Sequence, residues 1–247
     1  MSSAPSSAWA QQRSIVLRDG VGVGIAVGSF GLSFGALSVT SGLSLLQTCA
    51  LSVLAFTGGS QFAFIGVIGA GGTPLTGLAT AALLGSRNAL YGLRLAPMLQ
   101  LRGARRLLGA HLVIDESAAM ALANEDPATD HHVQRGARFA FWVTGLAVFV
   151  CWNLATLVGG LLGNALSDPR VFGLDAAVPA AFLALVWPRL RTRGMWGLAA
   201  LSAVVALMFV PLLPAGIPVL CAGLVAVIAA LIPRKADTDP TMNAAAP

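Results

Sequence analysis

Residues 20–42, GVGVGIAVGSFGLSFGALSVTSG, begin a run of 67 residues, 20–86, that contains no Asp, Glu, Lys or Arg. Two further runs without these residues cover 194–233, with 40 residues, and 139–167, with 29. A helix crosses the hydrocarbon core of a bilayer in about 20 apolar residues, so these runs have room for about three, two and one crossings. The sequence therefore predicts an all-α membrane protein.

The composition excludes an ordinary water-soluble domain. Of 247 residues, 56% are hydrophobic and 10% are charged, against roughly 25% charged in soluble domains. A transmembrane β-barrel would alternate polar and apolar residues in segments of about 10, whereas residues 198–213 are apolar on every side. The net charge of +5 comes from arginine clusters that flank apolar segments, so it indicates membrane topology and not nucleic-acid binding.

We expect one transmembrane domain, residues 20–233. It lies between a polar cytoplasmic N-terminus, 1–19, without a cleaved signal peptide, and a disordered polar tail, 234–247. If the arginine clusters are cytoplasmic, the second half contains four spans joined by external turns at 167–170 and 211–218. The expected spans lie near 139–164, 171–190, 195–213 and 216–233.

The first half does not fit this scheme. Residues 18–102 require an even number of crossings, yet their apolar length suggests three. One segment is therefore expected to be broken or re-entrant, or else the N-terminus lies outside. Residues 111–124 are short and acidic, so they are expected to form a partly buried helix on the cytoplasmic side. The whole is predicted to be a polytopic helical bundle of about six to eight transmembrane segments.

One face of the first predicted span consists of small residues. They recur at steps of three and four, which places them within about 80° around a helix. Such a face lets the backbone of another helix approach closely, as membrane helices commonly do. We interpret it as helix packing, with lining of a substrate pathway as the alternative. Its members include Gly20, Gly24, Gly28, Gly31 and Gly35.

The segment AFTGGSQF, residues 55–62, interrupts an apolar run with two glycines and three polar side chains. Unsatisfied backbone groups are costly in lipid, so this segment is expected to be buried in protein. In transporters, the half-helix after such a break offers N–H groups and a positive dipole to a carboxylate, and the unwound carbonyls accept from an ammonium group. An amino acid carries both groups. The alternative is an extramembrane turn at 57–60.

Charged residues near the apolar segments are the next candidates. Arg87, Tyr91 and Arg94 share one helix face, since they are spaced at i, i+4 and i+7. An arginine inside a bilayer costs at least about 2.5–3.5 kcal/mol and normally has a partner. The candidate partner of Arg87 is Asp175, in a later apolar stretch, although both side chains could instead reach an interface.

Two adjacent acids, Asp115 and Glu116, are candidates for a proton relay, with a solvated helix face as the alternative. No metal or other cofactor is expected, because the chain has no CxxC spacing. The three cysteines are interpreted as buried small hydrophobic residues. They are Cys49, Cys151 and Cys221.

Together these patterns resemble the AzlC family of branched-chain amino acid permeases over about residues 30–188. Five patches in order carry the resemblance. They are SFGAL at 33–37, FTGGSQFA at 56–63, Arg87 with YG at 91–92 and LAP at 95–97, Asp115 and Glu116 before a small-residue helix, and GLD at 173–175 through Phe182.

The resemblance implies the large subunit of a two-component exporter of branched-chain amino acids, including methionine, in the bacterial inner membrane. It also implies a small hydrophobic AzlD-type partner subunit and an ion gradient as the driving force. The predicted substrate-binding residues are Thr57, Gly58, Gly59, Ser60, Gln61 and Tyr91. The predicted coupling or charge-pair residues are Arg87, Asp175, Asp115 and Glu116.

The chain departs from the family pattern at three positions. Gly85 stands where the family usually has Asn, Asn88 where it usually has His, and Arg94 where a small polar residue is common. The exact substrate and a histidine-linked coupling therefore do not follow from the resemblance. The alternatives are a permease of the same architecture for another small solute and a non-transporting structural membrane subunit. An enzyme is not expected, since neither HExxH nor GxxxxGK[ST] occurs.

Overall fold

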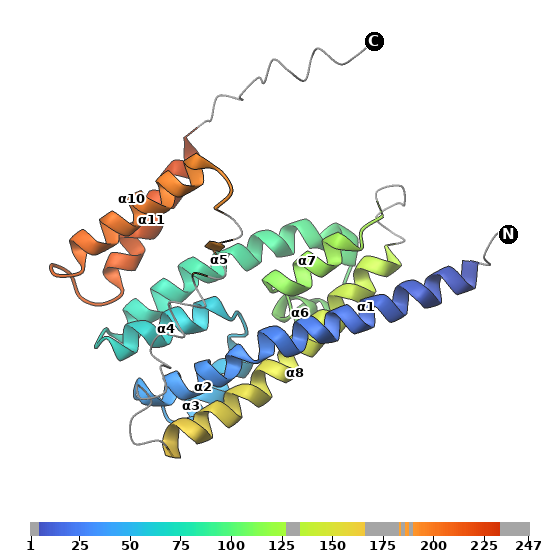
Figure 1. The fold of residues 1–247 in the computed structure, drawn as a ribbon, viewed down its shortest axis with the longest axis horizontal. Coiled ribbons are helices and arrows are strands. Elements are labelled where there is room, and N and C mark those ends of the chain that lie inside the picture. The colour runs from blue at the N-terminus through green and yellow to red at the C-terminus, as the bar shows by residue number, and fades with distance from the viewer. Residues whose placement is uncertain (1–4, 127–133, 166–182, 184–185, 188–189, 233–247) are drawn as a thin grey trace, which may run out of the picture.

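The computed structural model describes residues 5–126, 134–165, 183, 186–187 and 190–232 (Figure 1). Among these residues the regular structure is helical and no strand occurs, as the sequence predicted. The helices are α1 Pro5–Gly28, α2 Phe30–Thr40, α3 Leu45–Leu54, α4 Gly59–Gly69, α5 Pro74–Leu99, α6 Ala104–His111, α7 Asp115–Ala123, α8 Arg135–Ala165, α10 Arg193–Phe209 and α11 Ile217–Leu231.

The first two helices, α1 and α2, are nearly continuous. Ser29, between them, keeps helical backbone angles, with φ −58° and ψ −29°. Because α1 already begins at Pro5, most of the predicted polar N-terminus, 1–19, belongs to the same helix as the first apolar span. Pro5 at the start of a helix costs little, since the first N–H groups have no acceptor within the helix.

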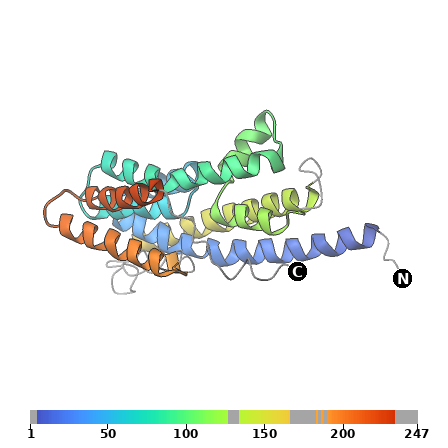
Figure 2. The same ribbon diagram turned by 90° about the horizontal axis from the view of Figure 1, so that it is seen from above.

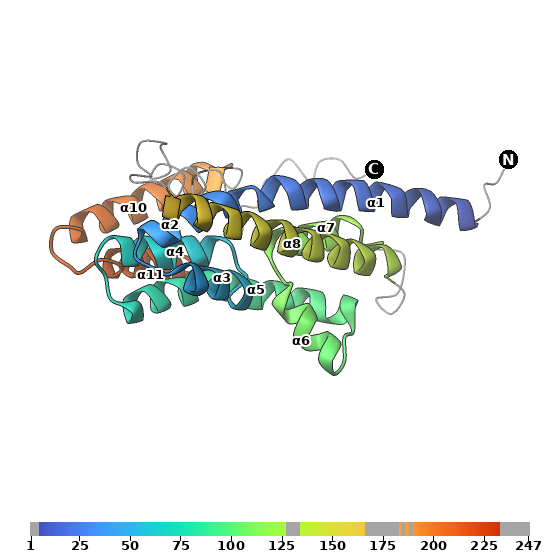
Figure 3. The same cartoon turned by 90° about the horizontal axis from the view of Figure 1, so that it is seen from below.

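The α1–α2 stretch packs along α8, and the two lie side by side in Figures 1 and 3. The small-residue face makes this contact: a methyl group built at Gly24 would lie only 2.7 Å from the Ala147 Cβ. Because residue numbers rise together along the contact, the two run parallel. The contacting pairs are Gly20 with Thr144, Gly24 with Ala147, Gly28 with Cys151, Gly31 with Ala155 and Gly35 with Gly160.

The third helix, α3, runs antiparallel to α8 and reaches only its middle. It starts beside the C-terminal part of α8, where Leu45 abuts Gly160. Near the end of α3, the Ser52 hydroxyl donates to Thr156 Oγ1 at 3.2 Å. Phe56, just beyond the end of α3, packs on Phe149, with ring centroids 5.1 Å apart. The chain then turns at 55–58.

The fourth helix, α4, returns toward the end from which α3 came. Phe62, in its first turns, packs on Trp152 with centroids 5.9 Å apart, and Gly69, its last residue, abuts Ser41 just after α2. Both α3 and α4 are about 15 Å long, half of a bilayer core. They form a hairpin that reaches only the middle of α8, which is the kind of broken segment expected in the first half.

Helix α5 runs antiparallel to α8 along the remaining side. The Arg138 Nε of α8 donates to the Met98 carbonyl at the end of α5, at 2.8 Å. Beyond α5, the short helix α6 projects from this end of the molecule (Figure 3). It then leads back to the middle of α8, where His111 packs on Phe149 with centroids 5.7 Å apart.

Helix α7 completes a second hairpin that enters from the opposite end. It begins at Asp115, near the middle of the fold, and ends beside the start of α8, where a methyl group built at Gly136 would lie 3.2 Å from the Asn124 carbonyl oxygen. The short, partly buried helix expected at 111–124 is present as α7. The preceding helix, α6, and the turn at 112–114 were not expected.

Helices α10 and α11 form an antiparallel pair that packs on α5 through α11. Their connecting turn lies at the end of the molecule away from the N-terminus (Figure 2), and Gly223 of α11 abuts Leu83 of α5. This turn agrees with the one expected at 211–218. Most of the span expected at 171–190 lies outside the described residues. The turn expected at 167–170 and the tail at 234–247 lie entirely outside them.

Arginines gather at one end of the described helices, the end at which α8 begins. The turns at the opposite end, 41–44, 70–73 and 210–216, contain no charged residue. Two helical stretches, Trp9–Thr40 and Arg135–Ala165, are long and apolar enough to cross a bilayer. Many large apolar side chains are exposed, for example Leu46 at 80% and Leu93 at 73%. A surface of this kind is consistent with contact with lipid.

Candidate functional site

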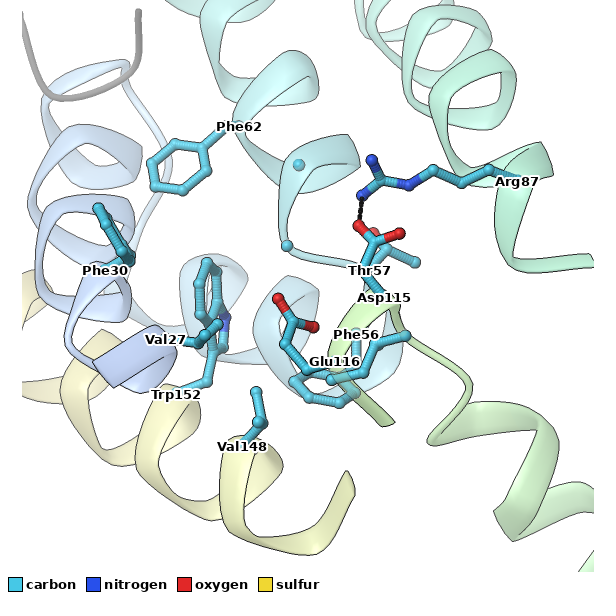
Figure 4. A pocket seen from close by; sticks show the side chains of 13 residues that line it. Val27, Phe30, Phe56, Thr57, Phe62, Arg87, Asp115, Glu116, Val148 and Trp152 are labelled. Atoms are coloured by element: carbon cyan, nitrogen blue, oxygen red, sulfur yellow. Dashed lines mark ion pairs between the residues drawn. The ribbon is translucent and has the colours of Figure 1, made fainter. Parts of the chain in front are cut away.

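A central pocket lies where three interruptions of the helices meet (Figure 4). These are the junction of α1 and α2, the tip of the α3–α4 hairpin and the tip of the α6–α7 hairpin; α5 and α8 close the sides. The pocket has a volume of about 150 Å³. Its lining residues are Val27, Phe30, Phe56, Thr57, Gly58, Gly59, Phe62, Arg87, Ile114, Asp115, Glu116, Val148 and Trp152.

The pocket is well inside the helical length of the fold. The rise of an α-helix places Arg87 about 20 Å from Pro74 at the start of α5, and Trp152 about 20 Å from Ala165 at the end of α8. Half-helices from both ends of the molecule reach this level. The site is therefore built as in transporters with broken helices, in which binding groups are held near the middle of the membrane.

The tip of the first hairpin is held by Gln61. Its Oε1 accepts from the Gly58 N–H at 3.3 Å, and its Nε2 donates to the Leu51 carbonyl at 2.9 Å, across the hairpin. Gly58 has φ +63° and ψ −92°, a conformation that a side chain would strain. The turn directs the N-terminus of α4, with Gly59 as its first residue, toward the pocket.

The tip of the second hairpin is held in the same manner by Ser117. Its Oγ accepts from the Ile114 N–H at 3.1 Å and donates to the Leu112 carbonyl at 2.6 Å. Ser117 is the third residue of α7, as Gln61 is of α4. Both side chains are buried, at 0% and 1% exposure. Two half-helix N-termini are thus fixed at the pocket by equivalent hydrogen bonds.

The charged groups of the pocket come from α5 and α7. Arg87 forms an ion pair with Asp115, with Nη2 and Oδ2 2.8 Å apart. The side chains are 29% and 16% exposed, so the pair is partly shielded from solvent. Glu116 lines the same pocket, and in Figure 4 its carboxylate points toward the interior, on the side of Trp152. The described residues include no ion pair to Glu116.

The opposite wall of the pocket is aromatic and aliphatic. Trp152 stacks on Phe34 and meets Phe62 edge to face, each with centroids 5.9 Å apart, and Phe34 meets Phe62 at 5.6 Å. The three residues are at most 4% exposed, so packing fixes their orientation. Val27 and Val148 add branched aliphatic surface to this wall. It can receive an apolar group but offers little to a charged one.

Six of the predicted site residues line the pocket. They are Thr57, Gly58, Gly59, Arg87, Asp115 and Glu116. Ser60 and Gln61 are buried behind the tip, and Gln61 acts there as a structural cap. Tyr91 packs against the hydrophobic core and does not line the pocket. Asp175 lies outside the described residues, and the partner of Arg87 among those described is Asp115.

Sequence reasoning missed most of the apolar wall. Trp152 and Val148 lie in an unbroken apolar helix that has no local signal of a site. Val27 and Phe30 flank the α1–α2 junction, where the sequence offers only Ser29, between Gly28 and Phe30, as a local hint. Which face of each helix meets the pocket depends on packing against distant segments.

Half-helices that meet at a charged, partly apolar pocket are features of a membrane permease. Comparison with known proteins agrees, since a family model described as AzlC protein matches residues 22–166, more than half of the chain. The chain belongs to the AzlC family, as the motifs predicted, and is a membrane permease of that family. No curated protein and no solved structure matched the chain.

Proposed function

We propose that this protein exports branched-chain amino acids across the bacterial inner membrane as a multi-pass transporter, with a small AzlD-type subunit and an ion gradient as driving force. One observation carries the proposal. The central pocket brings a free half-helix N-terminus, two carboxylates and a rigid apolar wall within reach of one small molecule. Those three groups match the carboxylate, the ammonium and the branched side chain of such an amino acid.

The substrate carboxylate would bind at the start of α4. The N–H groups of Gly59 and Ser60 are the first two of that helix and have no acceptor within it. Helix N-termini attract anions through these groups and through the helix dipole. The tip of the hairpin is held in place by Gln61, so little ordering is required when the substrate binds.

The substrate ammonium would bind on the α7 side, near Asp115 and Glu116, and its side chain would contact the wall of Trp152, Val148 and Val27. A cavity of about 150 Å³ binds benzene in a soluble protein, so the pocket has the scale of a small apolar side chain with its backbone groups. An amino acid with a charged side chain would leave that charge against the wall, at a high desolvation cost.

Export requires access from both faces of the membrane in turn. The two hairpins approach the pocket from opposite ends, and their tips meet where His111 packs on Phe56, with centroids 6.0 Å apart. Movement of one hairpin would open the pocket to one face while the other stays closed. The end that carries the arginines would face the cytoplasm, in accordance with the positive-inside rule.

Counterflow in liposomes tests the proposal. The purified chain is reconstituted alone and with an AzlD-type subunit, the vesicles are loaded with unlabelled valine, and entry of labelled valine is measured. We expect saturable entry in the two-subunit vesicles, with competition by leucine, isoleucine and methionine but not by lysine or glutamate. No valine entry in either preparation would contradict the proposal. Stronger competition by a solute that is not an amino acid would favour a permease for another substrate.

A further inference from the structure

We infer that Glu116 binds either a proton or the ammonium group of the substrate, so that the two compete for one carboxylate and are exchanged across the membrane. This rests on the proposed function and deepens it, because it names the coupling ion as H⁺ and assigns the residue that carries it. The two carboxylates of the central pocket thereby have different roles. Asp115 positions Arg87, and Glu116 exchanges its partner during transport.

The assignment follows from the charges that line the pocket. Arg87 and Asp115 are ion-paired at 2.8 Å and cancel. Glu116 then contributes one negative charge, and none of the described residues pairs with it. The surroundings are apolar, with Val148 and Trp152 on the facing helix. An unpaired charge in such surroundings is costly, so the carboxylate is stabilised by a cation or by a proton.

Few other titratable groups face Glu116. On α7 the neighbour is Asp115, and from α5 the facing group is Arg87. His111, at the end of α6, packs against Phe56 and Phe149 and does not line the pocket. The parts of α1, α2, α3, α4 and α8 at this level contain no Asp, Glu, Lys, Arg or His. Of the two carboxylates, only that of Glu116 is free to change its partner without breaking the ion pair.

The exchange balances in charge and protons. With the pocket open to the cytoplasm, Glu116 releases its proton to water and the carboxylate accepts the substrate ammonium. With the pocket open to the outside, the zwitterion leaves and an external proton binds to Glu116. One amino acid leaves the cell for each proton that enters, and one net positive charge moves inward per cycle. Export therefore draws on both the pH gradient and the membrane potential.

The test is valine affinity as a function of pH, measured by isothermal calorimetry on the purified two-subunit protein. Valine itself keeps its charges over the mildly acidic to neutral range. Competition with a proton predicts that the affinity of wild type for valine falls as the pH is lowered. In the acidic range where Glu116 is mostly protonated, the fall is about tenfold for each pH unit. In E116Q the affinity should be weaker at neutral pH and should not change with pH. E116D should keep the pH dependence with a shifted midpoint, because its carboxylate is retracted by one methylene.

Glu125→Gln is the matched control. It removes a carboxylate that is ion-paired with Arg94 outside the pocket, so wild-type pH dependence is expected. The same pH dependence in E116Q as in wild type would overturn the inference, as would a wild-type affinity that does not vary with pH. If E116Q binds no valine, an E116D midpoint equal to that of wild type would overturn it instead. Absence of binding of any amino acid by wild type would refute the proposed function as well.

Discussion

The contact between α1 and α8 can be tested with one methyl group and a control on the same helix. Gly24 is buried in this contact, and a Cβ built on it would lie 2.7 Å from the Ala147 Cβ and 2.9 Å from the Ala147 carbonyl carbon. Gly22 is exposed, and a Cβ built there meets nothing within 4 Å. Gly24→Ala and Gly22→Ala therefore make the same chemical change in opposite surroundings.

The expected effects have opposite signs. Carbon atoms in contact lie about 3.5–4.0 Å apart, so the alanine methyl group at position 24 would force α1 and α8 apart by about 0.8 Å. A gap of that size loses about a quarter to a half of the van der Waals attraction at each neighbouring contact. Overpacking of this kind costs about 1–3 kcal/mol, partly offset by the gain of about 0.5–1 kcal/mol when alanine replaces a helical glycine. Gly24→Ala should lower the free energy of unfolding by about 0.5–2 kcal/mol, and Gly22→Ala should not lower it.

Unfolding of both variants in detergent, by titration with SDS or by heating, gives the comparison. Trp152 lies on α8 in the same contact, so its fluorescence, read against a variant that lacks it, reports the loss of packing. Valine counterflow under the same conditions shows whether the pocket is affected. If Gly24→Ala unfolds together with, or later than, Gly22→Ala, the close approach of α1 to α8 contributes nothing to stability.

Gly58→Ala should lower the free energy of unfolding by about 1–3 kcal/mol through backbone strain at the hairpin tip, and should reduce valine counterflow. Gly66→Ala, in open space on α4, should transport valine as wild type does. Equal transport by both variants would contradict a strained tip. Gln61→Leu removes both hydrogen bonds that hold this tip and should lower the free energy of unfolding by about 1–3 kcal/mol, measured by SDS titration. Arg94→Ala breaks an exposed ion pair with Glu125 and should change the stability by less than about 1 kcal/mol; a larger loss would show that the pair is not a surface contact.

The break at 55–58 shows how far local sequence reasoning reaches. Two glycines and three polar residues in an apolar run predicted an interruption buried in protein, and the mismatch between apolar length and arginine clusters allowed a re-entrant segment. Both inferences follow from local composition, since backbone groups need partners in lipid wherever the segment lies. The second hairpin was missed because its tip, 112–114, carries neither glycine nor proline. It is closed by Ser117, and one serine near two acids is too common a pattern to predict a turn.

The sequence by itself determined that the chain is helical, apolar enough for a membrane, and interrupted near Gly58, because these properties depend on composition and on backbone chemistry along the chain. Only the tertiary structure decided that Asp115 pairs with Arg87, and that Trp152 forms the wall of the pocket. Such pairings depend on which helix faces meet. In this fold the glycine face of α1 and α2 sets them, because it allows α8 to approach closely enough to bring three separate interruptions to one pocket.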